Sequence, residues 1–440
     1  MQSESRLPTE ANKDGHLIRA IGFFGASFLI LNGMIGAGIF ALPAAVVSNA
    51  GFLSPWLFLG VGLLFITVVL TFAELSSYFS ESGGPVLYTS VAFGPLVGFN
   101  TGWILFLSRL TAFAANTNVL VIYIASMVPW VAGGWVRAVL IIVICGSLTI
   151  ANIMGVKEGM RTVAGFTLLK LVPLLMMVLL GLQYVGADNL LPNNLPTIDD
   201  LGGTTLLIIY AFVGFEQAAV SSGETINPRR NLPKAFIVTI IATALLYFLI
   251  CLVYISVLPD GGGRGQTLVD VGRVLAGPVG ASVITFTAIF SISGNLAAAM
   301  LTAPRLTLSL AEEHLLPRWF GRIHQKYGTP YNSIIFLGIL AAILAITGSF
   351  VYLATASSLA RLICYMLCIA ALPILRRKAE SEQQEHVFRL KGGYIIPLIA
   401  MGVCLWIAAQ SKPEAWIFMG GLLLAGFGLF WIEKRRIGKF

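Results

Sequence analysis

The stretch Asn32-Gly33-Met34-Ile35-Gly36-Ala37-Gly38-Ile39-Phe40 lies inside the first long apolar run of the chain, roughly residues 19–47. Its three glycines fall within six residues, and each costs a helix about 0.5–1 kcal/mol relative to alanine. In lipid, an unwound backbone has no water to satisfy its N–H and C=O groups. The stretch therefore predicts a helix that is broken inside a membrane, with its bare backbone lining a cavity or meeting a ligand.

The composition indicates a membrane protein. Of the 440 residues, 57% are hydrophobic and only 11% are charged, whereas a soluble domain is about a quarter charged. The net charge of +8 comes mainly from short loops and termini, so it does not indicate a nucleic-acid partner. The first apolar run follows a polar tail without a clear cleavage site, and we interpret it as a span rather than a signal peptide.

The cysteines indicate neither a metal site nor a cofactor. All five fall in apolar runs without clustered histidine or acidic partners, so we expect buried, small hydrophobic side chains. They are Cys145, Cys251, Cys364, Cys368 and Cys404.

Twelve apolar runs approach the length of about 20 residues that a spanning helix needs. They are predicted near 19–47, 52–79, 96–127, 136–155, 163–186, 201–222, 234–258, 279–311, 332–348, 350–375, 394–411 and 414–432. The resulting organisation is a tail (1–18), a ten-helix core (19–375), a loop (376–393), two further helices (394–432) and a second tail (433–440).

The distribution of lysine and arginine predicts the orientation. With the N-terminus inside, twenty of these residues fall in cytoplasmic segments, and four fall on the opposite side: Arg137, Arg264, Arg273 and Lys412. Positive residues favour the cytoplasmic side. We therefore predict that both termini are cytoplasmic, in a plasma membrane (the inner membrane if the cell is bacterial).

The sixth run repeats the interruption of the first. It contains Gly214 and Glu216 at its middle, five helices after the first break. Glycine-interrupted segments at corresponding positions of two halves indicate a transporter built from inverted repeats. We predict two five-helix repeats, at about 19–186 and 201–375, from this pattern alone.

The first break has the chemistry to hold an amino acid. The half-helix that begins near Ile39 offers free N–H groups and a positive dipole end to a carboxylate. The half-helix that ends near Met34 offers carbonyl oxygens to an ammonium group. The alternative is close packing of helices through Gly33 and Ala37, which leaves Gly36 and Gly38 unexplained.

Several motifs resemble those of the amino acid–polyamine–organocation (APC) superfamily, in the same order. The first is Gly33–Phe40, and the second is Phe72–Ser77 followed by Glu81–Pro85. The third is Phe212–Glu216 followed by Asn227–Pro233. Pro304-Arg305, Leu315–Pro317 and Gly328–Pro330 are similar to the stretch around the eighth helix of that superfamily.

This resemblance implies an all-α leucine-transporter-like fold with discontinuous helices 1 and 6. It implies that the N–H groups of Gly36, Ala37 and Gly38 bind a substrate carboxylate. It also implies an aromatic gate at Phe212 or Phe215 and a polar pocket position at Asn295. The amino group would meet backbone carbonyls near Ile35, Ala211, Phe212 and Val213.

Four charged residues lie at membrane depth and need partners. Glu216 serves either a proton-linked gate or the broken backbone as a structural acceptor. Lys170 either extends to the cytoplasmic surface or, as in the sodium-independent members that it resembles, replaces a sodium ion between helices 1 and 8. Arg109 either faces the pocket and disfavours cationic substrates or pairs structurally, and Arg361 is expected to pair with a neighbouring acid or carbonyl. Ser108 and Ala112 are small and leave room for substrate.

The sequence thus predicts a secondary amino acid transporter that works by alternating access, not an enzyme. We expect an L-amino acid as substrate, membrane lipid around the helices, and no sodium requirement. Coupling to protons by symport, or amino acid exchange, would drive it. A polyamine or other organic-cation antiporter is the alternative, and it requires a carboxylate facing the amine.

Overall fold

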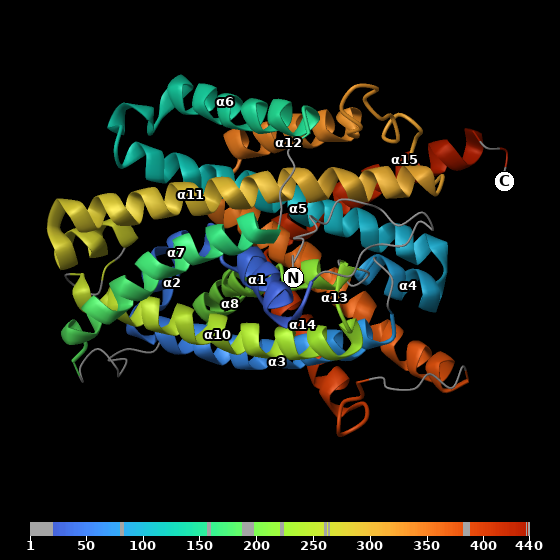
Figure 1. Ribbon diagram of the computed structural model, residues 1–440, viewed down its shortest axis with the longest axis horizontal. Coiled ribbons are helices and arrows are strands. Elements are labelled where there is room, and N and C mark those ends of the chain that lie inside the picture. The colour runs from blue at the N-terminus through green and yellow to red at the C-terminus, as the bar shows by residue number, and fades with distance from the viewer. Residues whose placement is uncertain are drawn as a thin grey trace, which may run out of the picture.

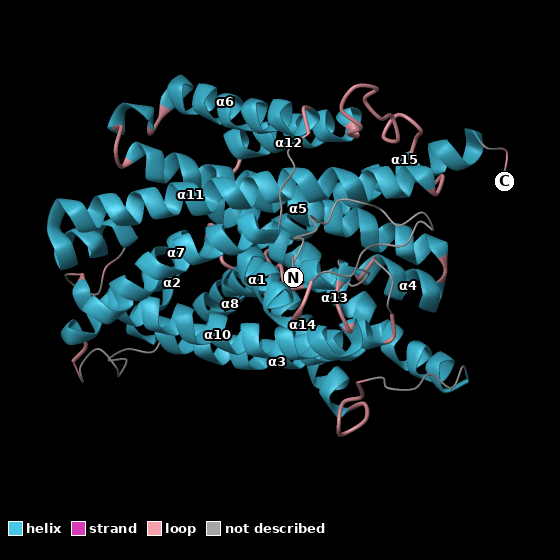
Figure 2. Cartoon of the chain, viewed as in Figure 1, coloured by secondary structure: helices cyan, strands magenta, loops and turns pink. Residues whose placement is uncertain are grey.

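The computed structural model describes residues 21–79, 83–155, 160–186, 198–220, 224–258, 262, 265–381, 388–436 and 438. Within these ranges the regular elements are all helices (Figure 2). Eight helical stretches there are long and apolar enough to cross a membrane, and four shorter apolar helices accompany them. The protein is therefore an all-helical, multi-pass membrane protein.

The α-helices are α1 (Phe23–Met34), α2 (Gly38–Ala50), α3 (Ser54–Ser77), α4 (Pro85–Phe93), α5 (Pro95–Ala125), α6 (Gly134–Ile153), α7 (Met160–Gly181), α8 (Ile198–Phe212), α9 (Glu216–Val220), α10 (Pro228–Val257), α11 (Leu268–Glu312), α12 (Tyr331–Thr347), α13 (Phe350–Ser381), α14 (Ile395–Ala409) and α15 (Pro413–Arg436). Short 3-10 turns lie at Gly51–Leu53, Pro129–Val131 and Leu182–Tyr184. Each of the twelve predicted apolar runs overlaps one of these helices or a broken pair of them. Helix α4 falls between two predicted runs and was not expected.

Two boundaries differ from those expected. Helix α13 continues to Ser381, so the polar segment predicted as a loop from 376 begins as helix. Its first residues are good helix formers, and Arg376 is anchored by an ion pair with Glu74. Helix α11 begins at Leu268 rather than near 279, behind a capping box of Thr267 and Asp270.

Helix α11 is kinked near its beginning. At Gly277 the backbone has φ +60° and ψ −149°, a conformation that side chains rarely allow, and Pro278 follows. The long predicted eighth helix is therefore the part after this kink, and the preceding turns run in a different direction.

The broken helices lie in the middle of the bundle (Figure 1). Helices α1 and α8 occupy the centre of the view, with α3 and α10 on one side and α5 and α11 on the other. Helix α1 packs on α7 and α10, while α2 packs on α8 and α8 packs on α13. The outermost helix α6 instead exposes Trp135, Ile142 and Ile150. Apolar exposure of this kind suits contact with lipid tails.

A buried ion pair joins α3 to α13 at one end of the bundle. The Glu74 carboxylate accepts hydrogen bonds from the Arg376 guanidinium at 2.7 and 2.8 Å, and from Leu390 N–H at 3.1 Å. It also accepts one from the Tyr78 hydroxyl at 2.8 Å. Burial, and then the Glu74 charge, raise the pKa of Tyr78, so its hydroxyl remains a donor. The ion-pair partner of Glu74 is thus Arg376 on α13.

A short backbone bridge lies near the same central helices. Ile21 N–H donates to the carbonyl of Glu224 at 3.0 Å, and Ile226 N–H donates to the carbonyl of Ile21 at 2.8 Å. This bridge connects the residues just before α1 with the segment that follows α9.

Candidate functional site

Both predicted breaks are present. Helix α1 ends at Met34, where Ile35 leaves helical geometry with φ −90° and ψ 82°, and α2 begins at Gly38. Helix α8 ends at Phe212, and α9 begins at Glu216. Gly214 between them has φ +111°, which strongly favours glycine. The glycines that weaken these helices are therefore the residues at which the backbone turns.

The two breaks contact each other through glycine backbones. A Cβ atom added at Gly33 would lie 2.8 Å from the carbonyl oxygen of Gly214. One added at Gly214 would lie 2.6 Å from the carbonyl oxygen of Gly33. No larger residue fits at either position without moving the backbone, so Gly33 serves close packing.

A narrow cavity of about 50 Å³ lies at this contact. Its walls come from both breaks and from the middle of α5, α11 and α13. The lining residues are Gly33, Met34, Gly36, Ala37, Gly38, Arg109, Ala112, Phe113, Asn116, Tyr210, Val213, Gly214, Gln217, Asn295, Ala299, Thr302 and Arg361. Small-molecule sites occur between helices where a few polar groups converge, and their volumes are roughly 300–1,000 Å³, so this cavity has the position of such a site but a much smaller volume.

Three polar side chains connect the walls. The Asn116 amide donates to Asn295 Oδ1 at 2.8 Å, and the Tyr210 hydroxyl donates to Asn116 Oδ1 at 2.5 Å. Asn295 also lies directly against Gly36, where an added Cβ would be 2.9 Å from its Nδ2. The network fixes α5, α8 and α11 around the first break.

The backbone groups at the first break are partly engaged. Gly36 N–H donates to the carbonyl of Met34 at 3.2 Å, whereas the structure gives the N–H groups of Ala37 and Gly38 no acceptor among its described residues. These two open the positive end of α2. The carbonyl of Ile35 accepts a hydrogen bond from Lys170, which leaves one of its lone pairs.

Five predicted pocket residues do not line the cavity, and one of them is Ile35, whose carbonyl binds Lys170. Ser108 faces α13, where it donates to the carbonyl of Ser357 at 3.0 Å and accepts from Arg361. Phe212 and Phe215 point away from the cavity into an aromatic cluster with Phe65 on α3, and Ala211 is also fully buried outside it. Ser108 therefore does not line this cavity, and neither phenylalanine closes it in this conformation. Ala112, Val213 and Asn295 do line the cavity.

Glu216 is fully buried and fully engaged. Its carboxylate forms an ion pair with Arg361 and accepts hydrogen bonds from the Tyr365 hydroxyl at 2.9 Å and from Gly214 N–H at 3.1 Å. The last bond holds the turn between α8 and α9. The expected pairing of Arg361 with a neighbouring acid is confirmed.

Lys170 points into the protein rather than toward a surface. Its Nζ donates to Asn32 Oδ1 at 2.8 Å, to the Asn32 carbonyl at 3.3 Å and to the Ile35 carbonyl at 2.5 Å. A cation here suits the negative C-terminal end of α1. Both partner residues lie at the end of α1 or directly after it. Among the described residues, Lys170 Nζ forms no hydrogen bond to α11.

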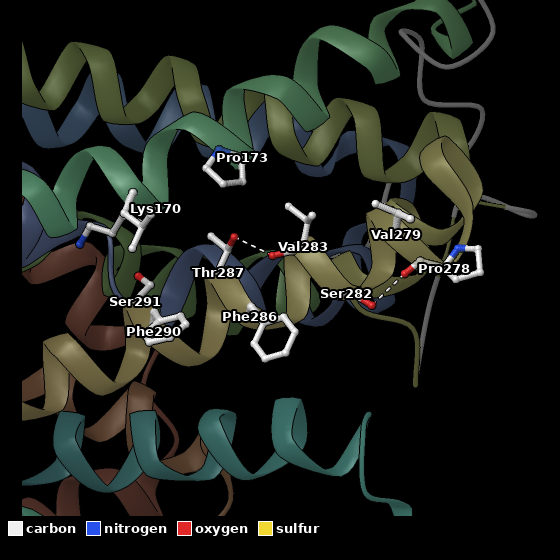
Figure 3. A pocket seen from close by; sticks show the side chains of 11 residues that line it. Lys170, Pro173, Pro278, Val279, Ser282, Val283, Phe286, Thr287, Phe290 and Ser291 are labelled. Atoms are coloured by element: carbon white, nitrogen blue, oxygen red, sulfur yellow. Dashed lines mark hydrogen bonds between the residues drawn. The ribbon is translucent and has the colours of Figure 1, made fainter.

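Lys170 also marks the inner end of a groove between α7 and α11 (Figure 3). The groove encloses about 520 Å³ and is lined mainly by apolar side chains, among them Pro173, Val283 and Phe290. Thr287 and Ser282 in its wall turn their hydroxyls back to carbonyls of their own helix at 2.7 and 2.9 Å. The groove thus presents an apolar surface.

Arg109 lines the cavity at the spacing i, i+3, i+7 with Ala112 and Asn116, which places the three on one face of α5. Its side chain is only 5% exposed. Of the two orientations that the sequence left open, the structure shows the one that faces the cavity.

Sequence reasoning missed Asn116, Tyr210 and Gln217 among the lining residues. Asn116 is an amide within an apolar run, and this signal would have identified it as a candidate. Tyr210 and Gln217 flank the second break, so their closeness to Gly214 in the sequence could have identified them as pocket residues.

Comparison with known proteins supplies the family. The amino acid permease family model matches residues 21–432. The serine/threonine exchanger SteT of Bacillus subtilis is 27% identical, over 96% of this chain and 99% of its own. The methylthioribose transporter and the branched-chain amino acid permease BcaP of the same organism are each 25% identical, over 97% and 96% of this chain and 95% and 94% of their own. The chain is therefore a transporter rather than an enzyme, and it belongs to the amino acid permease family.

Proposed function

We propose that the protein is a secondary transporter that binds an L-amino acid at the two contacting breaks. The observation that carries this proposal is the cavity itself, which brings the open N–H groups of Ala37 and Gly38 to the same space as the C-terminal end of α8. The N–H groups of Ala37 and Gly38 suit a carboxylate, and the C-terminal end of α8 suits an ammonium group. The relatives are named for different substrates, so their similarity does not identify the side chain of the amino acid that this protein would bind.

The mechanism that fits this site is alternating access by a ten-helix, two-repeat core, which two further helices complete to twelve spans, in the plasma membrane and with both termini cytoplasmic. The two broken helices, α1 with α2 and α8 with α9, would tilt against α5, α6, α11 and α12. Lys170 Nζ occupies the C-terminal end of α1, where it donates hydrogen bonds to Asn32 and to the Ile35 carbonyl. We therefore propose transport without sodium, by amino acid exchange or proton symport.

A polyamine antiporter has less support. It requires a carboxylate to receive the second amine, and the described cavity lining contains no aspartate or glutamate. The second break is followed directly by the acidic residue Glu216. Its carboxylate oxygens are already engaged by Arg361, Tyr365 and Gly214 N–H.

Uptake by proteoliposomes that contain the purified protein tests the proposal. Radiolabelled amino acids and putrescine would be offered with sodium, potassium or choline as the only cation. We expect uptake of at least one amino acid at the same rate in all three salts, and no putrescine uptake. Transport of putrescine alone would contradict the substrate class, and a requirement for a sodium gradient would contradict the role of Lys170.

A glycine substitution links transport to the site. A valine at Gly38 would place its Cβ about 3.0 Å from the Tyr247 hydroxyl and its branches over the open end of α2. We expect Gly38→Val to abolish substrate binding while the protein remains monodisperse. Unchanged affinity in this variant would place the site elsewhere.

A further inference from the structure

Arg109 lines the cavity but forms no ion pair with the residues that the structure describes. Its Nε is buried without a hydrogen-bond partner among these residues. The buried carboxylate of Glu216 is already engaged by Arg361 and Tyr365. Arg109 therefore presents a full positive charge to the cavity.

Such a charge is costly in this setting. A buried ion loses several kcal/mol of hydration unless partners replace the water, and a lone cation at membrane depth usually marks a functional site. Two arginines line the cavity, and the described lining contains no acid. Since Arg361 is neutralised by Glu216, one positive charge remains for a ligand to satisfy.

The number of groups in the cavity that can bind a charged group of the substrate distinguishes neutral from acidic amino acids. The open N–H groups of Ala37 and Gly38 at the start of α2 would take one carboxylate, and the carbonyl end of α8 would take the ammonium group. A neutral amino acid would then leave Arg109 unpaired. An acidic amino acid has a second carboxylate, and a guanidinium binds a carboxylate in a bidentate manner.

We infer that Arg109 binds the side-chain carboxylate of the substrate, so that the protein transports amino acids with an acidic side chain. This inference rests on the proposed function, because it assumes that the cavity is the transport site. It also means that α5, rather than either break, determines which substrate side chain is bound.

Amides of the same shape give the sharpest test on the wild-type protein. Proteoliposomes in sodium-free buffer would be offered labelled aspartate and asparagine, or glutamate and glutamine. We expect the acids to be preferred about tenfold or more, the usual value of a charged hydrogen-bond pair. Equal transport or a preference for the amides would overturn this inference and leave the proposed function intact. Failure to transport any amino acid would overturn both.

Variants then assign the preference to one residue. Arg109→Gln should lower the acid-to-amide ratio about tenfold, Arg109→Lys should retain most of it, and Arg273→Gln, at an exposed arginine, should leave it unchanged. The ratio is measured within one preparation, so a loss of folded protein cancels. An unchanged ratio in Arg109→Gln would overturn the assignment.

Chloride is the other anion that an unpaired guanidinium could hold. The same assay would be repeated with gluconate in place of chloride. We expect no change in the transport of acidic amino acids. Transport of neutral amino acids that requires chloride would overturn the inference and assign Arg109 to a free anion.

Discussion

Single residues at the first break explain why glycine is needed there. Gly36 leaves space for the Asn295 amide, which Asn116 holds in place with a 2.8 Å hydrogen bond. Gly33 leaves space for the backbone of the second break. The glycines thus differ in purpose, since one admits a side chain and the other admits a carbonyl.

An alanine at Gly36 should impair binding without unfolding the protein. Its Cβ would lie 2.9 Å from Asn295 Nδ2 and push the amide from its bond with Asn116. We expect the substrate Kd to rise about tenfold, the value of one lost polar contact, as measured by calorimetry on the purified protein. Gly294→Ala is the matched control, because a Cβ there meets no atom within 4 Å. Equal effects of the two substitutions would contradict this account.

Lys170 should matter through its charge at the end of α1. Lys170→Met removes the ammonium that binds Asn32 and the Ile35 carbonyl, and leaves these acceptors unpaired at the break. We expect lower thermal stability and at least about tenfold slower uptake, since hydrogen bonds to charged groups contribute about 1.5–3 kcal/mol. Lys412→Met, at an exposed position, is the control. Normal uptake by Lys170→Met would remove Lys170 from the mechanism.

At the scale of elements, the sequence located the breaks but not the orientation of the helices. Glycine content predicted both interruptions because it acts locally, within one turn. Ser108 and Arg109 are neighbours, yet Ser108 faces α13 and Arg109 faces the cavity. That choice depends on how α5 rotates against α13, which is set by packing over the whole interface. The directions of Phe212 and Phe215 depend in the same way on the turn at Gly214.

The contact between α3 and α13 should contribute strongly to stability. Glu74→Gln would leave the Arg376 guanidinium, which is 8% exposed, without its counter-charge. Breaking a buried pair in this way costs about 3–5 kcal/mol, so we expect a clear fall in the apparent Tm. The exposed pair of Glu380 and Arg389 offers the control Glu380→Gln, with little expected change. If both variants melt alike, the buried pair is not a stabilising contact.

For the whole molecule, composition established the class of protein, because a chain with 11% charged residues must bury or solvate its apolar faces in lipid. The number of spans is harder to derive. In the part of the chain that the structure describes, eight helical stretches have the length of a span, while α1, α8, α12 and α14 are shorter. A broken helix crosses the membrane as two short segments, so a criterion based on helix length alone does not count it as a span.

The predicted orientation can be tested with introduced cysteines. All five natural cysteines are buried, so the background labelling should be low. We expect Lys412→Cys to react with a membrane-impermeant maleimide on intact cells, and Lys391→Cys to react only after permeabilisation. The unmodified protein is the control, and the reverse pattern would contradict cytoplasmic termini.

The bridge between Ile21 and the segment after α9 has a consequence for the transport cycle. Its two backbone hydrogen bonds join Ile21, just before α1, to Glu224 and Ile226 in the segment that precedes α10. If α1 tilts during transport, this segment must therefore move with it, or both hydrogen bonds must break first. The bridge thus couples any movement of α1 to the segment between the second break and α10.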